Sequence, residues 1–146
     1  MRITYKGDYA LKTILDLALN YNNGVVTIHD LAKRLDIPVK FLEQVLLNLK
    51  KGGFVESRRG KIGGYLLAKH PAKIKVGDVV RFVEGYVEPI ACIENGYKGC
   101  RDLYRCAFRP VWQRVDEATK SVIDSVNFEE LLEKARANRR NFVYSI

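Results

Sequence analysis

The three cysteines of this 146-residue chain, Cys92, Cys100 and Cys106, fall within a single stretch of fifteen residues. Seven residues separate the first two and five separate the last two, whereas zinc ribbons place their cysteines in close pairs. Such wide gaps predict an open loop that wraps its ligand, and soft thiolates are the usual ligands of iron-sulfur clusters. We therefore expect a cluster site here. The alternative is a set of thiols that sense oxidation or bind zinc, without iron.

Arginines accompany the cysteines at positions 101, 105 and 109. Positive charge nearby stabilises thiolates and an anionic cluster, and it keeps the thiols reactive when no cluster is bound. We expect Arg105 and Arg109 to share one face of a long helix that begins near Cys106.

A second group of residues suited to chemistry is basic. Nearly all of the net charge of +8 lies between residues 39 and 75, where nine Lys or Arg accompany only two Glu. A phosphate-facing surface needs such concentration, because each phosphate that a cation neutralises releases a condensed counterion. The segment predicts double-stranded DNA as a partner; a basic surface kept for solubility is the alternative.

The elements that would position these charges form a helix-turn-helix pattern. Thr27, with Asp30 three residues later, resembles a capping box that opens a short helix ending at Leu35. Residues 36–38 form a turn, because proline suits the first turn of a helix and not its interior. A helix over 39–51 follows. Its apolar residues are expected to face inward, and they are Phe41, Leu42, Val45, Leu46 and Leu49.

Two strand candidates, residues 54–57 and 65–68, flank a glycine-rich hairpin tip that carries Arg58, Arg59 and Lys61. The glycines permit close backbone approach, and arginines at such a tip can enter a minor groove. As a nucleotide-binding loop the stretch matches poorly, since it lacks Gly-Lys-Ser/Thr before a helix. The expected fold is mainly α: a winged helix-turn-helix with a two-stranded β-hairpin wing and a long C-terminal dimerisation helix.

Further helices are expected on both sides of this unit. The first ends near Tyr21, a short one covers 76–84, a long one covers about 106–126, and a last one covers 128–139 after the capping residue Asn127. Four apolar residues form one stripe on the long helix, at Val111, Val115, Ala118 and Val122. The stripe fits a two-fold dimer, or packing on its own domain.

The length suits one domain with a helical extension. We expect a DNA-binding domain over 1–85, a cluster-binding loop over 86–106, and dimerisation and C-terminal helices over 107–146. The odd number of cysteines and the lack of a basic-then-apolar leader indicate a cytoplasmic protein, and no apolar run approaches the roughly 18 residues that span a bilayer. With two histidines and no nucleophile-base arrangement, neither an enzyme nor a small-molecule substrate is expected; an enzyme or electron carrier remains a third alternative.

Three motifs carry a resemblance. The Leu-Glu-Gln helix, the Arg-Gly-x-x-Gly-Gly-Tyr hairpin and the cysteine loop occur here in the order seen in the IscR and NsrR family of bacterial winged-helix regulators. The chain resembles that family over nearly its whole length. The resemblance implies a homodimeric transcription factor, usually a repressor, whose operator binding responds to an iron-sulfur cluster sensing redox state, nitric oxide or iron supply. A 2Fe-2S cluster is expected, with 4Fe-4S as the alternative.

The resemblance also assigns DNA contacts. Lys40, Phe41 and Gln44 match the base-facing part of the family's recognition helix, and Arg59 matches a wing residue that enters the minor groove. For Phe41, the inward-facing position given above is the alternative. Glutamine can bond an adenine edge, and lysine can reach guanine or phosphate. Glu43 has two interpretations: it accepts a hydrogen bond from a cytosine amino group, or it caps or pairs within its own helix.

By the same resemblance, Cys92, Cys100 and Cys106 match the three cluster cysteines, although the first gap is longer than in the best-known members. One branch has a histidine ligand where this chain has Arg109, and a guanidinium cannot ligate iron. Asp8 matches a carboxylate that another branch supplies from the partner subunit; it also fits a first-turn residue favoured by the helix dipole. Weaker candidates for the fourth ligand are Glu94, Asp102 and His70.

Overall fold

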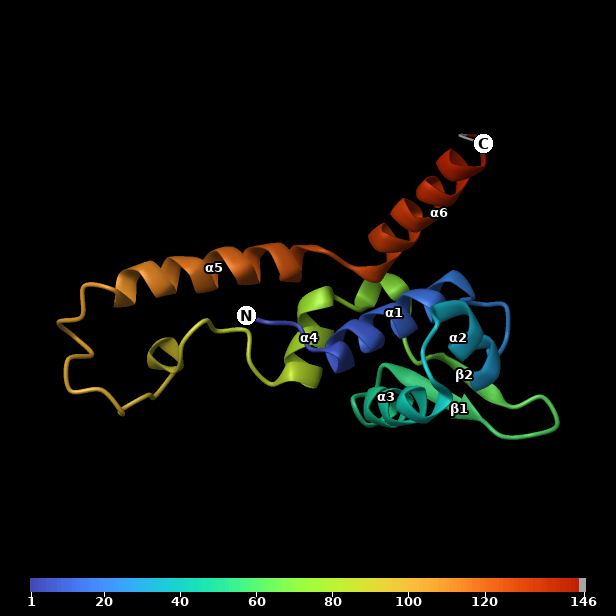
Figure 1. The fold of residues 1–146 in the computed structure, drawn as a ribbon, viewed down its shortest axis with the longest axis horizontal. Coiled ribbons are helices and arrows are strands. Elements are labelled where there is room, and N and C mark those ends of the chain that lie inside the picture. The colour runs from blue at the N-terminus through green and yellow to red at the C-terminus, as the bar shows by residue number, and fades with distance from the viewer. Residues whose placement is uncertain (145–146) are drawn as a thin grey trace.

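The computed structural model describes the backbone of residues 1–144 and the side chains of residues 1–141. Helices dominate the described part, and a two-stranded sheet accompanies them (Figure 1). The α-helices are α1 (Tyr5–Leu19), α2 (Ile28–Leu35), α3 (Val39–Lys51), α4 (Val76–Glu84), α5 (Arg109–Ser125) and α6 (Phe128–Tyr144). The strands are β1 (Val55–Arg58) and β2 (Gly64–Leu67), and short 3₁₀ turns occupy Pro71–Lys73 and Ala91–Ile93.

Side-chain caps begin two of the helices as the sequence predicts. The Thr27 hydroxyl accepts a hydrogen bond from the Asp30 amide at 3.2 Å and donates to the Asp30 carboxylate at 2.8 Å. Asn127 accepts from the Glu130 amide at 3.0 Å and donates to its carboxylate at 2.8 Å. Each cap satisfies an amide that has no partner within the helix, so the starts of α2 and α6 are encoded locally.

The helix-turn-helix and the wing have the predicted architecture. Asp36 adopts a left-handed conformation between α2 and α3, and β1 pairs with β2 in an antiparallel register that sets Arg58 opposite Gly64. A Cβ atom at Gly64 would lie 2.5 Å from the Val26 carbonyl oxygen, so glycine is required where the hairpin crosses the strand-like bridge between Val26 and Tyr65.

Helix α1 lies at the centre of the core and contacts α3, α4, α6 and β2. The core side chains come from every part of the winged unit and include Ile14, Leu17, Leu46 and Val79. Phe128, only 1% exposed, brings the start of α6 into the same core. Figure 1 shows α6 rising from the winged unit away from α3 and the hairpin.

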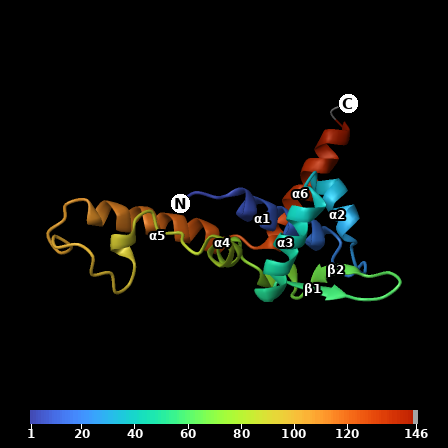
Figure 2. The same ribbon diagram turned by 60° about the horizontal axis from the view of Figure 1, so that its bottom comes forward.

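Helix α5 and the segment before it extend from the opposite end of the molecule (Figures 1 and 2). None of the 17 residues of α5 is buried. The C-terminal end of α5 is held to α4 by an ion pair. The Nη2 atom of Arg81 in α4 lies 2.6 and 2.7 Å from the two carboxylate oxygens of Asp124 in α5. Within the described part of the chain, no helix is long and apolar enough to cross a membrane.

Several boundaries differ from the sequence predictions. Helix α1 ends at Leu19 and not near Tyr21, since Asn22 turns into the left-handed region at φ 67°. The strands are shifted by one residue, and α6 continues past Arg139. Helix α5 begins at Arg109 and not at Cys106, because Pro110 favours the first turn of a helix.

Two predictions about individual side chains are wrong. Phe41 does not face inward with the other apolar residues of α3, but is 60% exposed. Arg105 does not share a helical face with Arg109, because it lies in the turn before α5. Phe41 lies in the first turn of α3 and Arg105 precedes α5, so helical periodicity does not fix the direction of either side chain.

Candidate nucleic-acid interface and cysteine site

The predicted recognition residues Lys40, Phe41, Glu43 and Gln44 are all exposed on α3. The opposite face of the helix is buried through Leu42, Val45, Leu46 and Leu49. Because one face of α3 packs against the core, the opposite face is exposed to solvent. We call the four exposed residues Lys40, Phe41, Glu43 and Gln44 the exposed row on α3. Among the described residues Glu43 has no ion pair or side-chain hydrogen bond, which leaves its carboxylate available to a ligand.

The wing residues Arg58, Arg59 and Lys61 are exposed as well, at the end of β1 and in the connecting loop. Figure 1 shows this loop projecting from the winged unit beyond the strands. Lys50, near the end of α3, donates to the Ser57 hydroxyl at 2.6 Å and so links the helix to β1. The helix and the wing are thereby held as two adjacent positive elements, the arrangement that a DNA groove and its flanking backbone accept.

The three cysteines line one hollow of about 500 Å³ between the 3₁₀ turn at 91–93 and the start of α5. All three are free thiols; Cys92 and Cys106 are half-buried and Cys100 is exposed. The remaining walls are largely apolar and come from Ile90, Ala91, Tyr97, Phe108 and Trp112. Three cysteines that lie up to fourteen positions apart in the sequence therefore line the same hollow. Their spacing in the sequence does not by itself require this arrangement.

Helix α5 is attached to this cysteine loop by two polar links that the sequence analysis missed. Arg109 donates from Nε to the Cys92 carbonyl oxygen at 3.3 Å. Lys120 lies 3.0 Å from Glu88 and 2.8 Å from Asp116, so it bridges the segment before the cysteines to α5. No local sequence signal marks either link, because the partners are 17 and 32 residues apart along the chain.

The ion pair between Lys120 and Glu88 shifts the pKa values of both residues. The hydrogen bond from Lys120 lowers the pKa of Glu88, and hydrogen bonds to backbone amides act in the same direction. The hydrogen bond to Asp116, followed by the one to Glu88, raises the pKa of Lys120. Asp116 keeps one oxygen, Oδ1, buried without a hydrogen-bond partner among the described atoms.

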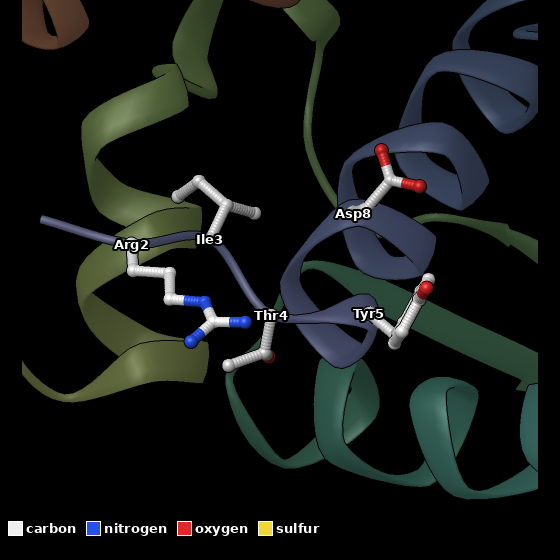
Figure 3. Close-up of a pocket in the computed structure, with 5 residues that line it drawn as sticks. All are labelled: Arg2, Ile3, Thr4, Tyr5 and Asp8. Atoms are coloured by element: carbon white, nitrogen blue, oxygen red, sulfur yellow. The ribbon is translucent and has the colours of Figure 1, made fainter.

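Asp8 lies elsewhere, in the first turn of α1, and does not line the cysteine hollow of its own chain. It borders a surface hollow of about 600 Å³ together with Arg2, Ile3, Thr4 and Tyr5 (Figure 3). The close-up shows its carboxylate directed away from the Arg2 guanidinium. Its ion pair with Lys12, at 2.6 Å, is exposed on both sides, and such pairs are weak.

The weaker ligand candidates are also apart from the cysteine hollow. His70 caps the 3₁₀ turn at 71–73, where its Nδ1 accepts from the Ala72 amide at 3.2 Å. Glu94 and Asp102 belong to the cysteine loop but do not line the hollow. Among the residues that the structure describes, no group of three or more His, Cys, Asp or Glu side chains is gathered closely enough to hold a single metal ion.

Comparisons with known proteins agree with this geometry. The Rrf2 family, described as an iron-dependent transcriptional regulator, matches residues 3–134. The HTH-type transcriptional regulator IscR of Xenorhabdus nematophila is 37% identical over 132 residues, which cover 90% of this chain and 79% of that protein.

Two solved structures are similar throughout. CymR, the global cysteine regulator of B. subtilis, has a TM-score of 0.78 and 30% identity, covering 92% of this chain and 98% of that one. IscR of T. potens has a TM-score of 0.74 and 31% identity, covering 92% of this chain and 88% of that one. The mainly helical fold with its two-stranded sheet is therefore that of these winged-helix regulators.

Proposed function

The chain belongs to the Rrf2 family of transcriptional regulators, and from this premise we propose that it is a homodimeric, DNA-binding repressor controlled by an iron-sulfur cluster. Three thiols would hold the cluster, those of Cys92, Cys100 and Cys106, and Asp8 of the partner subunit would supply the fourth ligand. Operator binding would involve the exposed row on α3 and the wing, through Lys40, Phe41, Glu43, Gln44, Arg58, Arg59 and Lys61.

The DNA contacts follow from exposure and charge. The row on α3 carries donors and an acceptor suited to base edges, and the wing carries guanidinium groups suited to the negative potential of a minor groove. Phe41, being exposed, supplies an apolar contact for a thymine methyl group. The surrounding lysines contact phosphates, which position the protein on the duplex without reading its sequence.

The convergence of three free cysteines on one largely apolar hollow is the observation that carries the cluster assignment. The donor set fits the group, because thiolates are the preferred ligands of iron-sulfur clusters and the remaining wall of the hollow is largely apolar. A cluster distributes its ligands over several iron atoms, so they need not approach as closely as around one ion. When bound, a 2Fe-2S cluster, or alternatively a 4Fe-4S cluster, would supply reversible redox chemistry.

The dimer assignment rests on α5. Its stripe of Val111, Val115, Ala118 and Val122 is exposed in the single chain, and Phe108 before it is exposed too. Helix α5 has no buried residues in the single chain, so its apolar stripe has no partner there. The same stripe of a second copy, related by a two-fold axis, would cover it. Such a dimer places two recognition helices at a defined separation for two half-sites.

A visible absorption and electron paramagnetic resonance spectrum of protein purified without oxygen, with iron and sulfide analysis, tests the cluster. We expect a coloured protein that contains both elements, with the spectrum identifying the cluster type. A colourless protein that cannot be reconstituted with iron and sulfide would overturn the assignment.

A second candidate is regulation by thiol oxidation or zinc, with no iron. It is favoured by the exposed thiol of Cys100 and by the structural similarity to CymR, the global cysteine regulator of B. subtilis. The two candidates differ in sulfide content. If sulfide is near zero while DNA binding responds to oxidant or zinc, the second candidate replaces the first.

A further inference from the structure

Asp16 is a buried acid that the DNA and cysteine sites do not use. Its side chain is 6% exposed, in the last turn of α1, where burial of a carboxylate is unfavourable without a partner. Arg34 of α2 supplies that partner in a two-point contact, from Nε to Oδ2 at 2.9 Å and from Nη2 to Oδ1 at 2.6 Å. Asn20 adds a longer contact to Oδ1 at 3.5 Å. The carboxylate therefore fixes the orientation of the guanidinium.

Arg34 keeps further hydrogen-bond donors after this contact with Asp16 is made. A guanidinium has five N–H donors, and the two-point contact with Asp16 leaves the others free to face outward. The side chain of Arg34 is 41% exposed, so these donors reach the surface. The hydrogen bond to Asp16 also raises the pKa of Arg34, which keeps it charged. A rigid, charged fork with free donors is the form in which arginine binds oxyanions.

Two more arginines reach the same place from the other end of the chain. Arg136 and Arg139 of α6 border a hollow of about 260 Å³ together with Arg34 and Asp16, and Leu19 and Asn20 complete it. Their spacing of three positions sets both on one face of α6. Among the described residues neither has a carboxylate within ion-pair distance.

We propose that this hollow between α1, α2 and α6 binds the phosphate group of a small phosphorylated molecule, through Arg34, Arg136 and Arg139. Three guanidinium groups and one carboxylate leave two positive charges in a single concave site. Like charges at this spacing repel one another when no anion is present, whereas a phosphate accepts from several guanidinium groups together. A purely structural role of the Asp16–Arg34 pair would not require the two arginines of α6.

The location separates this ligand from operator DNA. Figure 1 shows α6 extending away from α3 and the β1–β2 hairpin, so its arginines lie apart from the proposed DNA contacts. The hollow joins the first helix of the helix-turn-helix to the helix that follows α5. A bound phosphate would stabilise that junction, because it would interact with both α2 and α6.

Isothermal titration calorimetry with sodium pyrophosphate tests the site, with sodium chloride at matched ionic strength as the reference. We expect saturable binding of pyrophosphate by the full chain, weakened about tenfold or more in the double variant Arg136→Ala/Arg139→Ala. Lys134→Ala is the matched control, since Lys134 is an exposed cation of the same helix that does not line the hollow. It should bind as the unchanged protein does.

The same variants are then compared for DNA affinity and for helical content by circular dichroism. Unchanged values in both assays, together with lost pyrophosphate binding, support a separate site for a small phosphate compound. The proposal is overturned if pyrophosphate gives no more heat than chloride, or if the double variant binds it as well as the control. It is also overturned if the variant loses only DNA affinity, because the arginines would then contact the nucleic-acid backbone.

Discussion

Glu43 and Gln44 are neighbours on the exposed face of α3, but their side chains interact differently with DNA. The glutamine amide can donate to and accept from one adenine edge, whereas the glutamate repels phosphates and can only accept. The lack of any partner for Glu43 within the described protein favours a role in discrimination over pairing inside its helix. These two residues would then supply sequence preference, while the lysines around them supply affinity.

Replacing Gln44 by Ala should weaken binding to the preferred DNA sequence by about 1–3 kcal/mol and leave binding to random DNA nearly unchanged. The reason is that a base contact is lost while phosphate contacts remain. Fluorescence anisotropy at one fixed salt concentration, with a duplex selected from a random pool, measures both affinities. An equal loss on both kinds of DNA would show that Gln44 does not read bases.

Asp8 offers a carboxylate whose exposed ion pair with Lys12 holds it only weakly. If Asp8 is the fourth ligand of the proposed cluster, replacing it by Ala should alter the visible spectrum of the purified protein and lower its iron content. Lys12→Ala is the matched control, since it removes the same ion pair but keeps the carboxylate. Unchanged spectra and unchanged DNA binding in the Asp8 variant would refute its assignment as a ligand.

At the level of elements, the segment before the cysteines and α5 behave as one connected unit. Lys120 joins them through Glu88 and Asp116, Arg109 joins them through the Cys92 carbonyl, and Arg81 anchors the base of α5 through Asp124. A change at the cysteines can therefore reach α5 directly through these contacts, without passing through the core. The direction of α5, in turn, sets where a partner copy would lie.

Replacing Lys120 by Met should lower the free energy of unfolding by about 1 kcal/mol at neutral pH, less than for a fully buried pair because Lys120 is 36% exposed. The pKa of Glu88 is lowered in the folded protein, so its contribution is present above the ordinary value of 4.5 and is lost as pH falls through the lowered value. Thermal melts at decreasing pH should therefore show the two proteins converging below about pH 4.5. Lys73→Met is the control, and a difference independent of pH would contradict the role of Glu88.

At the level of the whole molecule, the winged unit is complete as a single chain, but α5 is not. Its apolar stripe remains exposed, with Val122 at 62%, while α6 returns to the core through Phe128. The exposed stripe and the cysteine hollow lie on the same extension, remote from α2 and the wing (Figure 1). We infer that the extension serves assembly and sensing, and that the winged unit serves DNA.

Replacing Val115 and Val122 together by Glu should convert the proposed dimer to a monomer, because like charges facing one another across a two-fold axis cost several kcal/mol. Sedimentation velocity measures the mass, and circular dichroism verifies that the helices remain. Gln113→Glu adds one negative charge at an exposed position of α5 outside the stripe and should leave the proposed dimer intact. A double variant that still sediments as a dimer would show that the interface lies elsewhere.

Much of the winged unit could be predicted from sequence, because its signals are local. The caps at Thr27 and Asn127 act over three residues, and the apolar periodicity of α3 assigns its buried face, with Phe41 at the first turn as the exception. The exposure of Gln44 and of the wing arginines follows from the same patterns. Element ends were less accurate, as at α1 and α5, because a turn residue or a proline can override periodicity.

The amino-acid sequence by itself determined the helix-turn-helix, the basic wing and the presence of three closely spaced cysteines, since each depends on residues near one another along the chain. Only the tertiary structure decided that these cysteines share one hollow, that Lys120 joins Glu88 to α5, and that Arg136 and Arg139 meet Arg34. Those arrangements join residues from separate elements. Their geometry depends on how the elements pack, a property of the whole core that no short sequence pattern specifies.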